Sequence, residues 1–347
     1  MSASIRDVAR AAGVSITTVS HVLSGQGRVA AETRRRVEQV ALDLDYRPNV
    51  HAQQLVTRRS RTIAIQVASF SESNVATGLI PHSDYFLDLL NGASEAAAEN
   101  GYALILTPPN VDISRIDEFA LDGAIVVDPR GDEPLFECRW HRRHPVVTTG
   151  RTTEGEPIRT LVDNDHRAAA LDMLDHLTQE GYERPALVTT KSSRSYIVDV
   201  LDAYRSWAAG RGIEEVVVEV GERPSRESAA AALRSLLERS ERPDAVYATS
   251  EELALGVLGE AERSGLAVPE DLGVCSAVDS TVLQLTRPQI TGTFLNPHEI
   301  GVRAVSLLLD LAADRDPPTR QPVIQTRLHA RASTLRSASR SARSTSL

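Results

Sequence analysis

The sequence predicts an α/β protein with a small all-α domain at its N-terminus, and three observations support this class. Before residue 61 the apolar residues follow helical spacing only. Beyond residue 61, β-branched apolar runs alternate with Ala- and Leu-rich helical stretches, a pattern typical of doubly wound parallel sheets. A length of 347 residues is too great for one compact core, so we expect more than one domain.

Three short helices are expected within the first 45 residues. The first has apolar residues at positions 5, 8, 9 and 12 and ends at Gly13, which tolerates the left-handed backbone of a tight turn. The second follows Ser15, whose hydroxyl can cap it, and turns Val19, Val22 and Leu23 inward. The third, near residues 32–45, places apolar positions 37, 40, 41 and 44 on one face. Helices joined by such a turn predict a helix-turn-helix.

Charge is unevenly spread along the chain. Residues 1–61 hold 10 arginines and 5 acidic residues, a net charge of +5, whereas residues 62–330 hold 24 basic and 42 acidic residues, a net charge of −18. A polyanion would therefore attract the N-terminal segment and repel the following one.

The N-terminal segment resembles the headpiece of the lactose-repressor (LacI) family almost position by position. The resemblance rests on IRDVARAAGVSITTVSHVLSG and on RVAAETRRRVEQVALDLDYRPN. It implies a DNA-binding regulator whose second helix enters the major groove, with base-edge contacts from Ser15, Ile16, Thr17, Thr18, Ser20 and His21. Ile16 has an alternative role as a core residue, because it lies three positions before Val19.

Other headpiece positions match or depart from the family. Thr33, Arg34 and Tyr46 match residues that contact phosphates and so position the domain without reading bases. His21 stands where the family usually has Arg, and Ala30 stands where it often has a helix-capping Ser. We therefore expect an altered base preference at one step, and a loss of about 1 kcal/mol of helix stability at Ala30.

Residues 49–61 resemble the family's hinge helix and linker. The resemblance implies that two such helices pack together in the minor groove of an operator bound by a homodimer. Asn49 would cap the helix, Ala52 would allow close approach, and Leu55 would pry a base step apart. A helix of about eight residues is unstable alone in water, so we expect it to form only when a dimer and DNA support it. An ordinary linker helix is the alternative.

Eight apolar runs after residue 61 predict strands: TIAIQVA, ALILT, GAIVV, PVVTT, ALVTT, EVVVEV, DAVYA and GVCSA. Four helices are expected to end in a left-handed glycine just before a strand, at Gly101, Gly181, Gly212 and Gly265.

The resemblance continues more thinly to about residue 334, through SGLAVPEDLGV and the closing RAST. It implies a two-lobed, type I periplasmic-binding-protein-like core. We place the headpiece at 1–48, the hinge at 49–61, the core at 62–335 and a disordered tail at 336–347. The lobes are expected to be 62–160 with 293–318, and 161–290 with 322–335.

The resemblance implies an effector site between the lobes, and this sequence departs from the family there. Val200 replaces an Arg that clamps the effector in many members, and Leu295 stands where a polar side chain is common. Unpaired buried hydroxyls are costly, so these changes weaken the default expectation of a sugar. The candidate effector contacts are Tyr85, Phe86, Asp128, Arg194, Ser250 and Asp279.

The leading hypothesis is a repressor whose operator affinity is controlled by a small molecule. No apolar stretch of about 18 residues occurs and the N-terminus lacks a signal peptide, so we expect a cytoplasmic protein outside the membrane. These features and the headpiece argue against a transporter's solute receptor. No nucleophile elbow, phosphate-binding loop or metal-ligand spacing occurs, so we expect no enzyme activity, no metal and no cofactor. A regulator that responds to a protein partner, or to no ligand, remains open.

Overall fold

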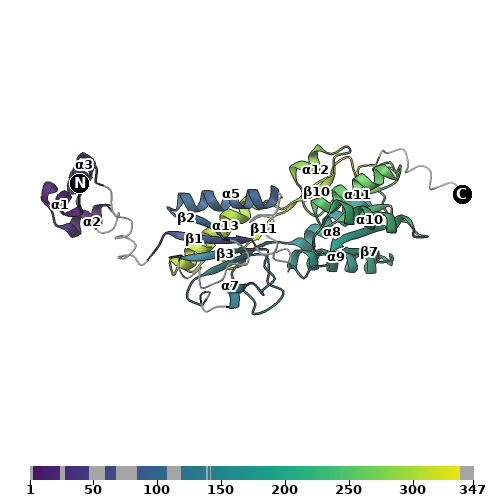
Figure 1. Cartoon of the computed structure of the whole chain (residues 1–347), viewed down its shortest axis with the longest axis horizontal. Coiled ribbons are helices and arrows are strands. Elements are labelled where there is room, and N and C mark those ends of the chain that lie inside the picture. Colours follow the sequence, from purple (N-terminus) through teal and green to yellow (C-terminus); the bar gives the residue numbers. More distant parts are fainter. Residues whose placement is uncertain are drawn as a thin grey trace. The chain divides into compact units, whose positions relative to one another are not determined.

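A computed structural model describes residues 3–23, 28–46, 59–67, 84–107, 119–137, 140 and 142–336 (Figure 1). The predicted hinge residues Asn49, Ala52 and Leu55 lie outside the described residues, as does the tail from residue 337 onward. Contacts divide the chain into two compact units, Met1–Arg61 and Thr62–Leu347, each described here by itself. Within the described ranges, no helix combines the length and the apolar character needed to cross a membrane.

The N-terminal unit, called the headpiece, contains α1 (Ile5–Ala12), α2 (Ile16–Leu23) and α3 (Ala31–Asp43). Its core holds Val8, Val19 and Val37, one from each helix and each 0% exposed. The turn after α1 depends on Gly13, whose φ of +65° is left-handed. These features confirm the predicted helix-turn-helix. The prediction for Leu44 was wrong, because α3 ends at Asp43 and the Leu44 side chain is 38% exposed.

The first lobe of the core contains a parallel sheet in the order β11-β5-β4-β3-β1-β2. Its strands are β1 (Thr62–Val67), β2 (Ala103–Thr107), β3 (Gly123–Val127), β4 (Val146–Thr149), β5 (Leu161–Asn164) and β11 (Val323–Ile324). Strands β1, β3 and β4 are almost fully buried, as expected of a sheet covered on both faces.

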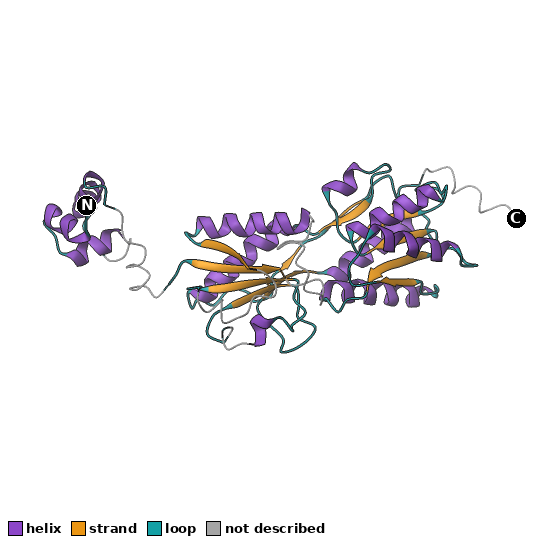
Figure 2. Ribbon diagram, viewed as in Figure 1, coloured by secondary structure: helices purple, strands orange, loops and turns teal. Residues whose placement is uncertain are grey.

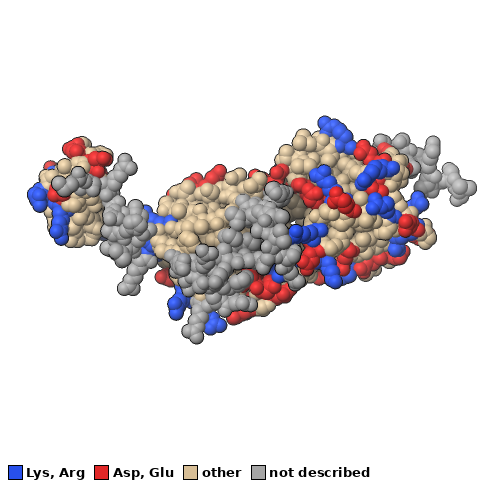
Figure 3. All heavy atoms as spheres, viewed as in Figure 1, with Lys and Arg blue, Asp and Glu red and all other residues tan. Residues whose placement is uncertain are grey.

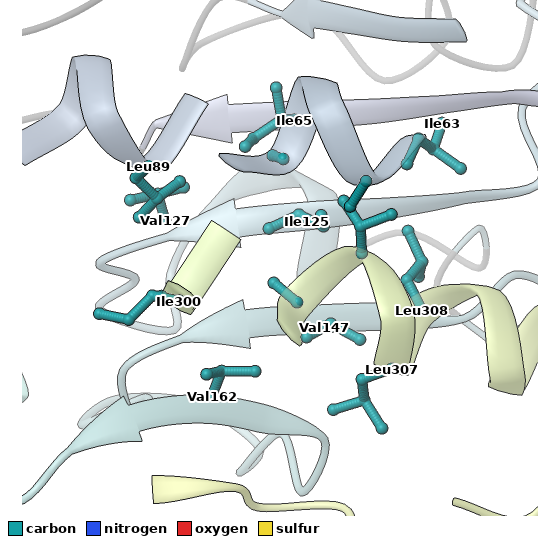
Figure 4. Packing of buried hydrophobic residues seen from close by; sticks show 14 of the residues in the cluster. Ile63, Ile65, Leu89, Ile125, Val127, Val147, Val162, Ile300, Leu307 and Leu308 are labelled. Carbon is teal, nitrogen blue, oxygen red and sulfur yellow. The ribbon is translucent and has the colours of Figure 1, made fainter. Parts of the chain in front are cut away.

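Helices α5 (Asp84–Glu99) and α13 (Pro297–Ala312) pack together over one face of this sheet. Figure 4 shows Leu89 of α5 beside the sheet residue Val127, in the same apolar cluster as Leu308 of α13 and the sheet residues Ile63 and Ile125. The two helices approach closely at Gly301, where a Cβ atom would lie 2.1 Å from the carbonyl oxygen of Leu89. The short α7 (Pro134–Glu137) lies beyond the other face, beside a separate apolar cluster.

The second lobe contains a sheet in the order β12-β10-β9-β8-β6-β7 with helices on both faces (Figure 2). Its strands are β6 (Pro185–Thr190), β7 (Val217–Val220), β8 (Ala245–Ala248), β9 (Gly273–Ser276), β10 (Thr291–Phe294) and the antiparallel β12 (Arg327–His329). One face packs on α8 (His166–Gln179) and α9 (Ser195–Arg211), and the other on α10 (Arg226–Leu237), α11 (Glu251–Arg263) and the short α12 (Thr281–Leu285).

The four predicted glycine caps are confirmed. Gly101, Gly181, Gly212 and Gly265 have φ values of +70°, +84°, +64° and +71°. After each glycine, the next amide donates to a carbonyl oxygen five residues back in the preceding helix, which satisfies a terminal acceptor.

The chain passes between the two sheets three times, after β5, β10 and β11. Each crossing lies a few residues later than predicted: Leu161–Asn164 and Val323–Ile324 pair within the first sheet, and Thr291–Phe294 pairs within the second. Strands of two to four residues are too short to show a hydrophobic period. Asn164 ties the crossings together, because its amide donates to the carbonyl oxygens of Leu295 at 3.0 Å and Ile324 at 2.9 Å.

Candidate functional site

Helix α2 presents a polar face to solvent and an apolar face to the headpiece. Val19 and Val22 are buried, whereas Ile16 is 46% exposed. This exposure excludes the alternative of Ile16 as a core residue. Of the six predicted base-edge residues, all are exposed except Thr18, which is half-buried: Ser15, Ile16, Thr17, Thr18, Ser20 and His21.

The start of α2 is ordered by its own side chains. The Thr18 amide donates to the Ser15 hydroxyl at 3.0 Å, and the hydroxyls of Ser15 and Thr18 lie 2.8 Å apart. Ser15 therefore caps the helix as expected, and its hydroxyl is already engaged. Ala30 occupies the corresponding position before α3 and makes no side-chain cap, as the sequence predicted.

The predicted phosphate contacts lie elsewhere on the headpiece surface. Thr33 and Arg34 are half-buried in the first turn of α3. Tyr46 packs against the headpiece core, and burial raises the pKa of its hydroxyl. Part of each of these residues stays at the surface, and their contact with phosphates stays a prediction.

In the core, three of the predicted effector residues come together between the lobes. Tyr85 lies at the start of α5, Asp128 directly follows β3, and Arg194 directly precedes α9. The Arg194 guanidinium, 3% exposed as a residue, donates a hydrogen bond across the lobes to the Asp128 carbonyl oxygen. Carboxyl ends of parallel strands and the loops after them form the usual ligand site of such sheets.

Three neighbours in this inter-lobe site were missed from the sequence. Asp163 is the last but one residue of β5, His166 begins α8 and Tyr196 is the second residue of α9. The His166 Nε2 atom lies 3.3 Å from the Asp163 carboxylate, and its ring lies 6.0 Å from that of Tyr196. Asp163 could have been found as a polar residue at the carboxyl end of a buried strand, but β5 itself was not predicted.

The charges of these groups act on one another. Burial, reinforced by the charges of Asp128 and Asp163, raises the pKa of Tyr85 well above its usual range. Burial likewise raises the pKa of Asp128 to about 6, although the positive charge of Arg194 opposes the shift. Among the described residues, none donates a hydrogen bond to the Asp128 carboxylate or bonds the hydroxyls of Tyr85 and Tyr196. All three residues are half-buried, so part of each stays open to a ligand.

The raised pKa predicts a pH-dependent cost at Asp128. The folded state binds a proton more tightly than the unfolded state, so stability falls as pH rises from about 4 to about 6. Asp128→Asn removes the charge and should raise the free energy of unfolding of the core above pH 6, by an amount on the order of 2 kcal/mol, with little effect near pH 4. Denaturant unfolding across this pH range measures the difference. Asp172→Asn, at an exposed aspartate of α8 with no described ion pair, is the matched control. Equal pH profiles for Asp128→Asn and the unaltered chain would contradict the prediction.

The other three predicted effector residues have roles within one lobe. Phe86 is 7% exposed in the first-lobe core, because it lies one helix position from Tyr85 and so on another face. The Ser250 hydroxyl accepts from the Leu253 amide and caps α11. The Asp279 side chain, 2% exposed, is held by the Arg331 guanidinium at 2.6 and 2.7 Å and by His329 Nδ1 at 2.7 Å. Each of these three side chains thus has a structural role, and its contact with the effector stays a prediction.

The two positions at which the sequence departs from the family, Val200 and Leu295, are occupied by packed apolar side chains. Val200 is 2% exposed in the apolar cluster beneath α9, and Leu295 is 6% exposed at a crossing. Neither position presents a polar group to the space between the lobes.

Ion pairs and hydrogen bonds also join the lobes beside the site. Arg151, just after β4, forms two hydrogen bonds of 2.8 Å with the carboxylate of Asp199 on α9. Ser193 donates to Glu154 at 2.7 Å, and the Thr281 amide donates to Asp84 at 2.9 Å. The two lobes are thus connected at several points outside the three crossings.

Comparisons with known proteins agree with this architecture. Residues 4–49 match the family model of bacterial regulatory proteins of the lacI family, and residues 174–334 match a periplasmic binding protein-like domain. The HTH-type transcriptional regulator CelR of Thermobifida fusca is 31% identical over 337 residues, which cover 94% of this chain and 96% of that protein. The chain belongs to the LacI family. Catabolite control protein A of Staphylococcus xylosus is 28% identical over 325 residues, covering 91% of this chain and 94% of its own.

Solved structures of LacI-family members show the same fold. A complex of the transcriptional regulator CelR with cellobiose has a TM-score of 0.69 at 26% identity, covering 95% of this chain and 99% of that one. The lac repressor dimer bound to operator and an anti-inducer has a TM-score of 0.75 at 20% identity, covering 97% and 100%. This LacI-family chain is therefore a DNA-binding transcriptional regulator with a helix-turn-helix headpiece and a periplasmic-binding-protein-like core.

Proposed function

We propose that the protein is a cytoplasmic homodimeric repressor, without enzyme activity, whose operator affinity is set by a small molecule bound between the core lobes. The observation that carries the proposal is the inter-lobe site, where the Asp128 carboxylate and two tyrosine hydroxyls have no described hydrogen-bond partner. A ligand bound there would contact both lobes, because Tyr85 and Asp128 belong to the first lobe and Tyr196 to the second. Binding could thus shift the lobes relative to each other.

The headpiece supports the DNA-reading half of the proposal. Its net charge of +5 draws it to the phosphate backbone, while Ile16 and Thr17 offer methyl groups that can contact thymine. A homodimer would place two such helices on a near-palindromic site, with Leu55 of each hinge at its centre.

His21→Arg tests this reading of bases. A neutral imidazole offers one donor and one acceptor, whereas arginine can bond two acceptors of a guanine at once. The substitution should change the preferred base at one step of each half-site, a preference worth about 1–3 kcal/mol. Selection of binding sites from random DNA, carried out in parallel for both proteins, measures the change.

Arg35→His is the matched control, because Arg35 is an exposed headpiece residue outside the six predicted base contacts. It should weaken binding to all sequences alike and leave the selected site unchanged. Identical selected sites for His21→Arg and the unaltered protein would show that His21 does not read bases.

The effector is best sought by calorimetry on the intact protein. Cellobiose is the first compound to titrate, since a relative of 26% identity is known in complex with it. The departures at Val200 and Leu295 argue that other metabolites belong in the same series. An effector that binds between the lobes should lose affinity in Tyr196→Phe, which removes one hydroxyl and keeps the ring. Undiminished affinity in this variant and in Asp128→Asn would place the ligand elsewhere.

A further inference from the structure

A second concave site lies on the first lobe, away from the inter-lobe residues. It is a groove of about 960 Å³ between the segment after β3, the loop between β4 and β5, and the end of α13. Basic side chains dominate its polar lining, with four arginines and one histidine: Arg142, Arg143, His144, Arg159 and Arg320. We call it the arginine groove. None of the predicted or observed inter-lobe site residues lines it.

The arginines of the groove are largely without counter-charges. Arg142, Arg143 and Arg159 are exposed and form no ion pair with any described residue. Arg320 contacts Asp316 at 3.3 Å through an exposed ion pair, which contributes little in water. Like charges that share one concave surface repel each other, and a bound anion would remove that cost.

Two of the three acidic residues in the lining of the groove have hydrogen-bond partners. Asp132 is bonded by the Arg130 guanidinium at 2.7 and 3.1 Å, and Glu154 accepts from the Ser193 hydroxyl at 2.7 Å. Glu156 is the remaining carboxylate in the lining. The lining thus holds four arginines against three carboxylates, one of them paired with Arg130, in a core segment that carries 42 acidic and 24 basic residues. Figure 3 shows the basic and acidic residues of one face in blue and red.

The walls of the groove are held in place by backbone contacts. At Gly131 a Cβ atom would lie 1.9 Å from the carbonyl oxygen of Glu154, so the two loops touch directly. The amides of Thr153 and Glu154 both donate to the carbonyl oxygen of Arg130 at 2.7 Å. His144 stacks on the buried Trp140 with ring centroids 4.6 Å apart. A preformed wall lowers the entropy cost of binding.

We propose that the arginine groove binds a small phosphorylated metabolite, independently of the ligand between the lobes. Guanidinium groups bond phosphate oxygens in pairs and keep their charge at all physiological pH values, which suits them to a polyanion. The volume of about 960 Å³ lies within the range of small-molecule sites, although the groove is open to solvent along one side. A ligand in the groove would also affect the contact between the lobes, because Glu154 of the groove accepts a hydrogen bond from Ser193 of the second lobe.

Calorimetric titration of the full-length protein with inorganic pyrophosphate, at physiological ionic strength, tests the proposal. We expect saturable binding that weakens about tenfold or more in Arg142→Gln/Arg143→Gln, since each lost charge-assisted contact is worth a sizeable part of 1.4 kcal/mol. Arg223→Gln/Arg242→Gln is the matched control, with the same charge change at two exposed arginines of the second lobe. Asp128→Asn, which alters the inter-lobe site, should also bind pyrophosphate normally.

Three results would overturn the proposal. The first is no saturable binding by the unaltered protein, and the second is equal affinity in Arg142→Gln/Arg143→Gln. The third is an equal loss of affinity in the control pair, which would mean that pyrophosphate binding depends only on the net charge of the protein. Circular dichroism of each variant confirms folding, and Arg159→Gln supplies an independent single change in the lining.

Discussion

Removal of residues 1–61 should lower affinity for a selected operator by a factor of about 1,000 or more, because specific sites are bound that much more tightly than other DNA. The remaining segment 62–330 carries a net charge of −18, so it repels the phosphate backbone as well as lacking the reading helix. The core should stay folded, since the contacts divide the chain between Arg61 and Thr62. Fluorescence anisotropy at fixed salt measures the affinity, and circular dichroism checks the fold.

A full-length variant separates loss of the headpiece fold from loss of chain length. Val19→Asp buries a charge at a position that is 0% exposed in the headpiece core and leaves residues 62–347 intact. It should lose operator binding as completely as the truncation. Sequence-specific binding by either protein would refute the assignment of DNA recognition to the headpiece.

Arg331→Met should destabilise the second lobe by about 3–5 kcal/mol, because it leaves the buried Asp279 carboxylate without its main partner. Burial opposes ionisation of Asp279, but hydrogen bonds from Arg331 and His329 outweigh it and lower its pKa. Arg331 also donates to the carbonyl oxygen of Ile290 at 2.7 Å, which fixes the segment after β12 to the residue just before β10. Denaturant unfolding followed by circular dichroism measures the loss.

Arg327→Met is the control for this prediction, since Arg327 is an exposed residue of β12 with no described ion pair. Its effect should be within about 0.5 kcal/mol, as for most surface substitutions. If Arg331→Met unfolds at the same denaturant concentration as the unaltered chain, the pairing of Arg331 with Asp279 does not stabilise the fold. Asp279 would then be available to contact the effector.

The sequence predicted the elements with strong periodicity and missed those without it. Eight strands were identified from apolar runs, whereas β5, β10, β11 and β12 were not. Strands β5 and β10 read LVDN and TGTF, so polar or small residues interrupt the apolar pattern, and β11 has only two residues. These short strands adjoin the crossings, which explains why the lobe boundaries shifted.

The site was predicted in part, for a related reason. Asp128 follows a long apolar run, so its place at the carboxyl end of a strand could be inferred. Ser250 and Asp279 are polar residues at equivalent strand ends, yet a helix amide and an arginine already engage their side chains. Such pairings depend on tertiary contacts between distant residues, which no local pattern shows. The closing RAST has a structural role, with Ser333 and Thr334 0% exposed and hydrogen-bonded to β9 and β10.

Operator affinity measured with the lobes held together and forced apart tests most directly whether the core controls the headpiece. Arg151→Cys/Asp199→Cys, in a Cys138→Ser background, places two thiols where the inter-lobe ion pair lies, and a short dithiol-reactive reagent can bridge them. The remaining Cys275 is buried and protected from the reagent. Arg151→Asp instead sets a carboxylate opposite Asp199 and should drive the lobes apart.

We expect the operator affinities of the bridged protein and of Arg151→Asp to differ by about tenfold or more, the usual size of coupling between two sites. For an effector that holds the lobes together as the bridge does, the direction of the difference shows whether it induces or co-represses. Mass spectrometry confirms the bridge. Selection of binding sites from random DNA checks that the headpieces of both proteins still prefer the same site. Equal affinities in the two states would contradict control of the operator complex by the lobes.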